Sequence, residues 1–226
     1  SDWSTLAVQR PPPRYPDFSY AQKTGTAVTQ GIGAALAVAG LGILVANAAA
    51  RGDAWYVAAY SIFGASMVSL YMASTLYHAA RAPKLKKALE ILDHAAIFVL
   101  IAGSYTAFAL TILRHGPGWW LFGAVWAIAA FGITMETLFL NRWPAVTLFA
   151  YLAMGWMIVL VWKPFSAAAP RITSVYLIAG GLSYTVGTIF YALGRKWGWF
   201  HIGWHLFVIG GTVCHFFSAL SAIPNA

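Results

Sequence analysis

The sequence predicts an all-α fold, a bundle of seven helices that cross a membrane. Of its 226 residues, 60% are hydrophobic and only 9% are charged, whereas soluble domains carry about 25% charged residues. Long apolar runs recur along the chain, each of about 20 residues or more, which is the length that a helix needs to cross a hydrocarbon core about 30 Å thick. Short breaks that contain Lys, Arg, Gly or Pro separate these runs. The pattern is typical of a multi-pass membrane protein.

Seven apolar runs follow one another along most of the chain. They cover residues 25–50, 54–80, 88–113, 118–140, 144–163, 172–194 and 199–222. Residues 1–23 are instead polar and proline-rich, and we expect them to form an extended arm in the cytoplasm. The predicted organisation is therefore an arm of residues 1–23 followed by one transmembrane domain of residues 24–222.

The orientation of the bundle follows from its basic residues, which are enriched on the cytoplasmic side of membrane proteins. The N-terminal arm and the second, fourth and sixth breaks together hold ten of the 14 Lys and Arg residues, and the other breaks hold four. This asymmetry places the N-terminus in the cytoplasm and the C-terminus outside, in a plasma (bacterial inner) membrane. The net charge of +8 thus reflects topology, and we expect no nucleic-acid partner. The oligomeric state stays open.

Two histidines at the start of the last predicted helix suggest a metal site. His201 and His205 are four residues apart, so they share one helix face with about 6 Å between them. Both imidazoles can then reach one metal ion, as in helical zinc motifs with this spacing. An ionisable residue at membrane depth also points to function. The alternative is that both are interfacial histidines at the end of a transmembrane helix.

Three further polar residues are predicted to lie in the same layer of the membrane. With the orientation above, His78 ends the second helix, Ser74 lies one turn deeper, and Asp93 lies in the first two turns of the third helix. At 1.5 Å per residue, all three fall roughly 5–10 Å below the cytoplasmic surface, level with the histidine pair. Three histidines and an open position match a catalytic zinc, and Asp93 would hold or deprotonate its water. Alternatively, Asp93 faces its helix dipole and Ser74 joins helices.

Four other ionisable residues are assigned different roles: His94, His115, Glu136 and His215. His94 follows Asp93 directly and points about 100° away from it, so we expect a supporting or interfacial position. His215 lies about 15 Å deeper than His205 and off the metal-binding face. His115 falls in a break on the far side, and Glu136 is expected to pair with Arg142.

Three motifs in this order resemble the haemolysin III family. They are Ser74-x-x-x-His78, Leu92-Asp93-His94, and His201-x-x-x-His205 with His215 ten residues further on. The family comprises bacterial relatives of the progestin and adipoQ receptors, including the adiponectin receptors, and the resemblance covers about residues 20–222. It implies a seven-helix bundle with a cytoplasmic N-terminus and a zinc ion held by His78, His201 and His205. It also implies that Asp93 and Ser74 lie beside the zinc-bound water.

The start of the first helix departs from this family pattern. The family usually carries acidic residues, an Asn and a Thr-His-Gly there, whereas this chain has Thr29-Gln30-Gly31 and neutral or basic residues before it. Gln30 cannot act as a base. We therefore do not expect the first helix to supply a catalytic base.

The residues leave three classes of function open. The first is a zinc-dependent intramembrane hydrolase of amide-linked lipids, which the resemblance implies because the wider superfamily includes alkaline ceramidases; its partner would be a membrane lipid. The second is a receptor-like or membrane-homeostasis protein with a structural zinc. The third is a haemolysin-type cytolytic protein. A pore would need a polar stripe through several helices, and the sequence has no mid-helix charges to form one, so the third class is the least favoured.

Overall fold

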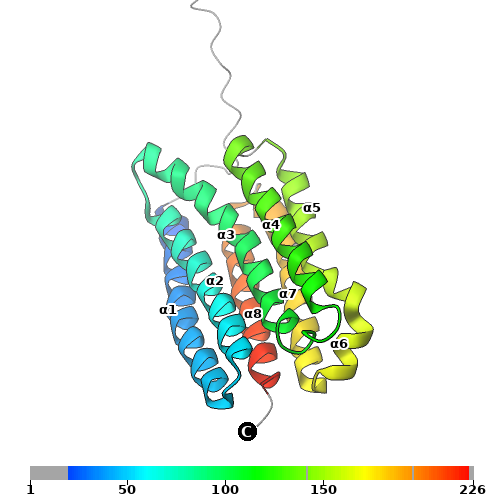
Figure 1. Cartoon of the computed structure of the whole chain (residues 1–226). Helices are drawn as coiled ribbons and strands as arrows, with labels where there is room; N and C mark the ends of the chain where they lie inside the picture. The colour runs from blue at the N-terminus through cyan, green and yellow to red at the C-terminus, as the bar shows by residue number, and fades with distance from the viewer. Residues whose placement is uncertain (1–19, 141, 195, 224–226) are drawn as a thin grey trace, which may run out of the picture.

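The computed structural model describes residues 20–140, 142–194 and 196–223. In these ranges the chain is helical without any β-strand, and seven segments are long and apolar enough to cross a membrane. Figure 1 shows the segments side by side as a bundle, with successive long helices running in opposite directions. The predicted all-α, seven-helix fold is confirmed.

The helices follow the predicted order closely. The first four are α1 (Tyr20–Arg51), α2 (Ala54–Ala79), α3 (Pro83–Ala109) and α4 (Gly118–Phe139). The fifth span consists of α5 (Pro144–Gly155), the 3₁₀ turn η2 (Met157–Val161) and α6 (Trp162–Ala168). The last two are α7 (Arg171–Gly194) and α8 (Gly198–Ser221).

The first and third helices begin earlier than predicted. Helix α1 starts at Tyr20, although its apolar span starts at Thr24; residues 1–19 of the expected arm lie outside the described residues. Helix α3 was predicted over residues 88–113 but runs from Pro83 to Ala109. Proline fits the first position of a helix, and the lysines that follow it are good helix formers. Most of the break expected between the second and third apolar runs, residues 81–87, therefore belongs to the start of α3.

The fifth span is broken, whereas the sequence predicted one helix over residues 144–163. Pro164 lacks the N–H that a continuous helix would bond to the carbonyl of Leu160. At the break, the Tyr105 hydroxyl donates a hydrogen bond to the Gly155 carbonyl (2.7 Å) and accepts one from the Ile158 N–H (2.8 Å). A backbone break at membrane depth needs such partners, because lipid offers none.

Helices that follow one another in the sequence mostly pack against each other, and the last helix also packs against the first. Helices α1 to α4 pack in order, α8 packs against α7 and α1, and α5 contacts α3 and α7. Helix α3 is the most buried of the seven spans. The starts of α1 and α8 and the end of α2 meet at one end of the bundle (Figure 1).

Candidate metal centre and cavity

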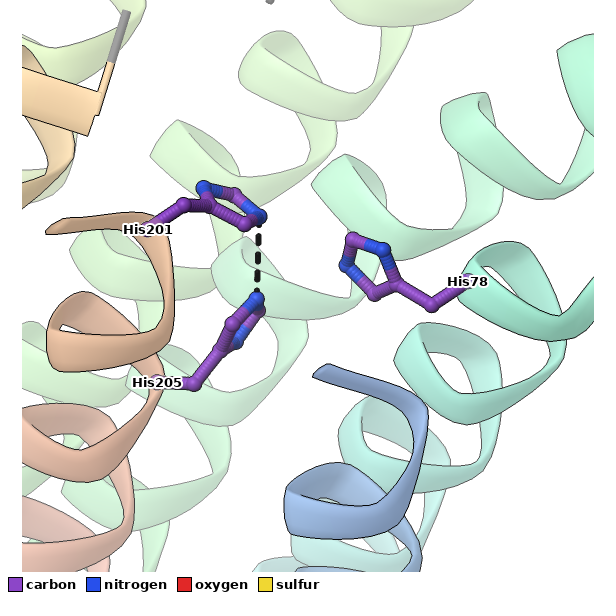
Figure 2. Close-up of side chains that lie close together, drawn as sticks. All are labelled: His78, His201 and His205. Carbon is purple, nitrogen blue, oxygen red and sulfur yellow. Dashed lines mark hydrogen bonds between the residues drawn. The ribbon is translucent and has the colours of Figure 1, made fainter. Parts of the chain in front are cut away.

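Three histidines converge where α2 ends and α8 begins. His78 lies in the last turn of α2, and His201 and His205 lie in the first two turns of α8, with only 4% and 5% of their surfaces exposed. Figure 2 shows the three rings pointing into a common space between the two helices. The Nε2 atoms of His201 and His205 are 3.0 Å apart, and the His78 ring centroid lies 5.4 and 5.1 Å from theirs.

The arrangement fits a single metal ion. One ring nitrogen from each histidine lies within 4.8 Å of the other two. Nitrogens bound tetrahedrally to zinc at about 2.05 Å are about 3.3 Å apart, close to the separation in the His201–His205 pair. The Nε2 atom of His78 is buried and has no hydrogen-bond partner among the described residues. Three imidazoles suit zinc, copper, iron or nickel, so this group could hold one such ion.

Local sequence explains why these side chains meet. The i, i+4 spacing puts His201 and His205 on one face of α8. Gly194 ends α7 so close to α8 that a Cβ atom there would lie 3.1 Å from the His201 backbone nitrogen. His78 comes from α2, which ends one residue later and is capped at Ala80 by a backbone hydrogen bond to Leu76. The position of His78 relative to the other two histidines therefore depends on how α2 packs beside α8.

A cavity of about 500 Å³ extends from this group into the bundle. Near the histidines its wall includes Ser74, Asp93 and His205. Along α3 the wall continues from Asp93 to Phe108, a rise of about 22 Å over fifteen positions of the helix. The rest of the wall is mostly aliphatic and aromatic and comes mainly from α3, α5, η2, α7 and α8, with single residues from α1, α2 and α6: Gln30, Leu70 and Trp162. The volume is typical of a small-molecule site.

The two polar residues predicted to assist the metal lie on the wall of this cavity. Ser74 is one turn before His78 on α2, with 3% of its surface exposed, and Asp93 projects from α3 with 9% exposed. Both line the same cavity as His205. The structure thus brings together the hydroxyl, the carboxylate and the histidine group from three different helices.

Behind Asp93 lies a buried polar cluster that links three helices. The His94 Nδ1 atom is 3.2 Å from Glu136 Oε2, and the Thr147 hydroxyl donates a 2.6 Å hydrogen bond to Glu136 Oε1. The Tyr151 hydroxyl also donates to the His94 carbonyl at 2.9 Å. His94 therefore supports the packing of α3 against α4 and α5.

Glu136 has partners that the sequence interpretation did not assign. Arg142 was the expected partner, but the carboxylate is 96% buried and bonds to His94 and Thr147. The Arg142 guanidinium lies 5.5 Å above the Trp143 ring. The available signal was that Glu136 is the one acidic residue in its predicted span, because an acid at membrane depth favours a buried polar partner over a surface pair.

The remaining histidines lie outside the metal group. His215 lines the cavity, where its ring packs 5.2 Å from that of Tyr184 and lies against Gly180. A Cβ atom at Gly180 would overlap this ring, so the close approach requires glycine. His115 is exposed in the turn between α3 and α4 and contacts Arg114. Neither belongs to the trihistidine group, in agreement with the sequence interpretation.

Fold and site together define a class: a seven-helix membrane protein with a buried trihistidine group at one end of an apolar cavity. The family model described as Haemolysin-III related matches residues 18–216. The chain belongs to the haemolysin III family, which confirms the resemblance drawn from its motifs.

Curated relatives occur in bacteria and in mammals. The chain is 41% identical to the hemolysin-3 homolog of Bacillus subtilis (strain 168) over 203 residues, covering 90% of this chain and 95% of the relative. It is 41% identical to hemolysin-3 of Bacillus cereus over 206 residues, covering 91% and 94%. More distantly, it is 27% identical to the human monocyte to macrophage differentiation factor over 183 residues, covering 74% and 71%.

Proposed function

We propose that this protein is a zinc-dependent hydrolase that cleaves amide-linked lipids inside the plasma (bacterial inner) membrane. The observation that carries the proposal is the cavity of about 500 Å³, because His205, Asp93 and Ser74 all line it. A ligand in the cavity would therefore meet a metal-binding group, a carboxylate and a hydroxyl at one end. A purely structural metal site has no need of an adjoining ligand cavity.

The trihistidine group supports zinc as the metal. Three protein ligands and one open position are the arrangement of catalytic zinc sites, whereas structural zinc sites use four protein ligands. His78, His201 and His205 would hold the ion. When bound, zinc lowers the pKa of a coordinated water towards neutrality and polarises a substrate carbonyl.

Asp93 and Ser74 would complete the site. A carboxylate at the cavity wall accepts a proton from the attacking water and returns it to the nitrogen of the amine that leaves. Such general acid–base catalysis contributes typically about 10²–10⁴-fold to a rate. The Ser74 hydroxyl can donate a hydrogen bond to the substrate or the water, and its buried position on α2 fixes it one turn from His78.

The shape and lining of the cavity support a lipid substrate. The cavity wall follows α3 from Asp93 to Phe108, a rise of about 22 Å, and is lined mainly by apolar side chains, which suits one extended acyl chain. The polar end then receives the group to which the chain is attached. An amide bond placed there lies beside the water nucleophile and the proton acceptor.

The names of the Bacillus relatives, hemolysin-3 and hemolysin-3 homolog, suggest a cytolytic activity instead. A water-filled pore needs polar side chains along its whole length. The wall away from the histidines carries residues such as Leu100, Ile101 and Phe108. This lining favours an acyl chain over water, and it supports the hydrolase.

Turnover by the purified protein tests the proposal. We expect protein in nanodiscs to release free fatty acid from a panel of ceramide-like amides. A chelator should abolish release and added zinc should restore it, while His205→Ala should be inactive under all conditions. The proposal is wrong if zinc-loaded protein releases no fatty acid from any member of the panel, or if release is unaffected by complete removal of the metal.

A further inference from the structure

Gln30 occupies an unusual place on α1, the helix that lacks the usual family motif. Its side chain is only 1% exposed. It lies on a buried stripe with Thr26, Ala34, Ala37 and Leu44, whose spacing puts them on one helix face. Helix α1 packs against α2 and α8, so this stripe faces the two helices that carry the histidines.

The Gln30 amide points to a ligand. Its Nε2 atom is buried and has no hydrogen-bond partner among the described residues. A buried donor left unpaired destabilises the folded protein. Gln30 also lines the cavity together with Ser74, Asp93 and His205. A ligand in the cavity can therefore supply the acceptor that the described part of the chain does not.

Helix packing places Gln30 level with the polar end of the cavity. Helices α1 and α2 are antiparallel, and Gly33 lies directly against the Tyr71 ring. Gln30 precedes Gly33 by three residues and Ser74 follows Tyr71 by three, so Gln30 and Ser74 share one level.

The packing of α1 against α8 independently places Gln30 at the depth of the metal-binding histidines. It runs parallel to α1 (Figure 1), and Gly25 contacts Ile202. Counted from that contact, Gln30 lies about 7.5 Å deeper and His205 about 4.5 Å deeper. The amide is therefore about 3 Å from the level of His205 along the helix axis.

We propose that Gln30 is a substrate-positioning residue whose Nε2–H donates a hydrogen bond to the carbonyl oxygen of an amide-linked lipid. The inference rests on the proposed function and adds the group that recognises the amide. A neutral carboxamide cannot take the proton of water, but it can donate to a carbonyl. A donor aimed at that oxygen also stabilises the negative charge that develops on it during hydrolysis.

Ligand binding tests this role without requiring turnover. Two probes compete with a fluorescent acyl ligand for the full-length protein in detergent: a long-chain fatty amide and the straight-chain hydrocarbon of the same length. The variants are Gln30→Met, which keeps the size and loses the donor, and Gln30→Leu as a second apolar replacement. Thr26→Val is the matched control, since Thr26 is equally buried one turn earlier but does not line the cavity.

We expect Gln30→Met and Gln30→Leu to raise the Kd for the amide by about 10-fold. This factor corresponds to the free energy of one hydrogen bond to a buried group. Binding of the hydrocarbon should not change, and Thr26→Val should affect neither probe. The melting temperature of the lipid-free protein should rise in Gln30→Met, because the unpaired donor is gone. A residue with a merely structural role would lower it.

Two outcomes overturn the inference: unchanged amide affinity in both Gln30 variants, or an equal loss of affinity for amide and hydrocarbon. Either result, obtained while the wild-type protein still hydrolyses lipid amides, removes the role of Gln30 and leaves the hydrolase intact. Conversely, selective loss of amide binding in a protein that hydrolyses nothing supports Gln30 as an amide-binding residue and contradicts the proposed function.

Discussion

At the scale of single residues, the site depends on two kinds of proximity. The pairing of His201 with His205 is local, because residues four apart share a helix face. His78 is more than 120 positions away in the sequence and joins them only because α2 ends beside the start of α8. Each histidine should therefore be needed to hold the metal.

Removal of one ligand tests this dependence. We expect purified wild-type protein to contain about one zinc ion per chain, as a three-histidine site predicts, and His78→Ala and His205→Ala to lose it. Elemental analysis of protein purified without added metal gives the measurement. His115→Ala is the matched control, because His115 is exposed in the turn between α3 and α4. Zinc contents like that of wild type in both ligand variants would contradict the assignment.

The three histidines could be identified from the sequence, but not all of the residues around them. His78, His201, His205, Ser74 and Asp93 could be grouped from helix phase and membrane depth alone. The partners of Glu136 and the contact of Gln30 with the cavity could not, because both depend on which face of each helix meets its neighbours. These helices carry apolar residues on every face, so the sequence pattern does not show which face packs against the neighbouring helices.

At the scale of elements, the fifth span shows how an interior polar group stabilises a broken helix. The Tyr105 hydroxyl satisfies a carbonyl before the break and an N–H after it. Gly155 and Pro164 are residues that weaken a continuous helix, yet the apolar run predicted a single helix here, and the partner on α3 could not be identified from the sequence. The break also shapes the cavity, since Gly155, Trp156 and Ile158 line it.

The Tyr105 hydroxyl should therefore contribute to stability. We expect Tyr105→Phe to lower the melting temperature in detergent, because two backbone groups lose their partner at about 1–3 kcal/mol for each buried unpaired group. Tyr176→Phe is the control, since the Tyr176 ring packs on Phe217 and its hydroxyl makes no hydrogen bond with the described residues. Equal melting temperatures for Tyr105→Phe and wild type would mean that this bridge does not stabilise the break.

At the scale of the whole molecule, the described residues form seven helices long and apolar enough to cross a membrane, and this odd number predicts that the start of α1 and the end of α8 lie on opposite sides. The number of spans and their order could be predicted because each apolar run is long and bounded by breaks. The helix ends were less predictable: lysines after Pro83 are polar enough to suggest a loop, yet they extend α3. Long lysine side chains allow this, since their charged ends reach the aqueous interface.

The orientation of the bundle in the membrane is predicted from the uneven distribution of its basic residues. Ten basic residues on one side against four on the other favour a cytoplasmic N-terminus and an external C-terminus. We expect a reporter fused after Arg81 to give a cytoplasmic signal and one fused at the C-terminus to give an external signal. The same signal from both fusions would be incompatible with seven spans, and the reverse pair of signals would invert the assigned orientation.

Hydrolysis at the metal site is tested most directly by Asp93→Asn. The carboxylate lines the cavity but is not one of the three histidine ligands, so the variant should keep its fold and its zinc. The carboxamide side chain of the Asp93→Asn variant cannot accept the proton of the water. Release of fatty acid should therefore fall by about 10²–10⁴-fold. The measurement compares fatty-acid release, zinc content and melting temperature in wild type and Asp93→Asn. Equal turnover in both proteins, with equal zinc content, would contradict hydrolysis at the metal site with Asp93 as the proton acceptor.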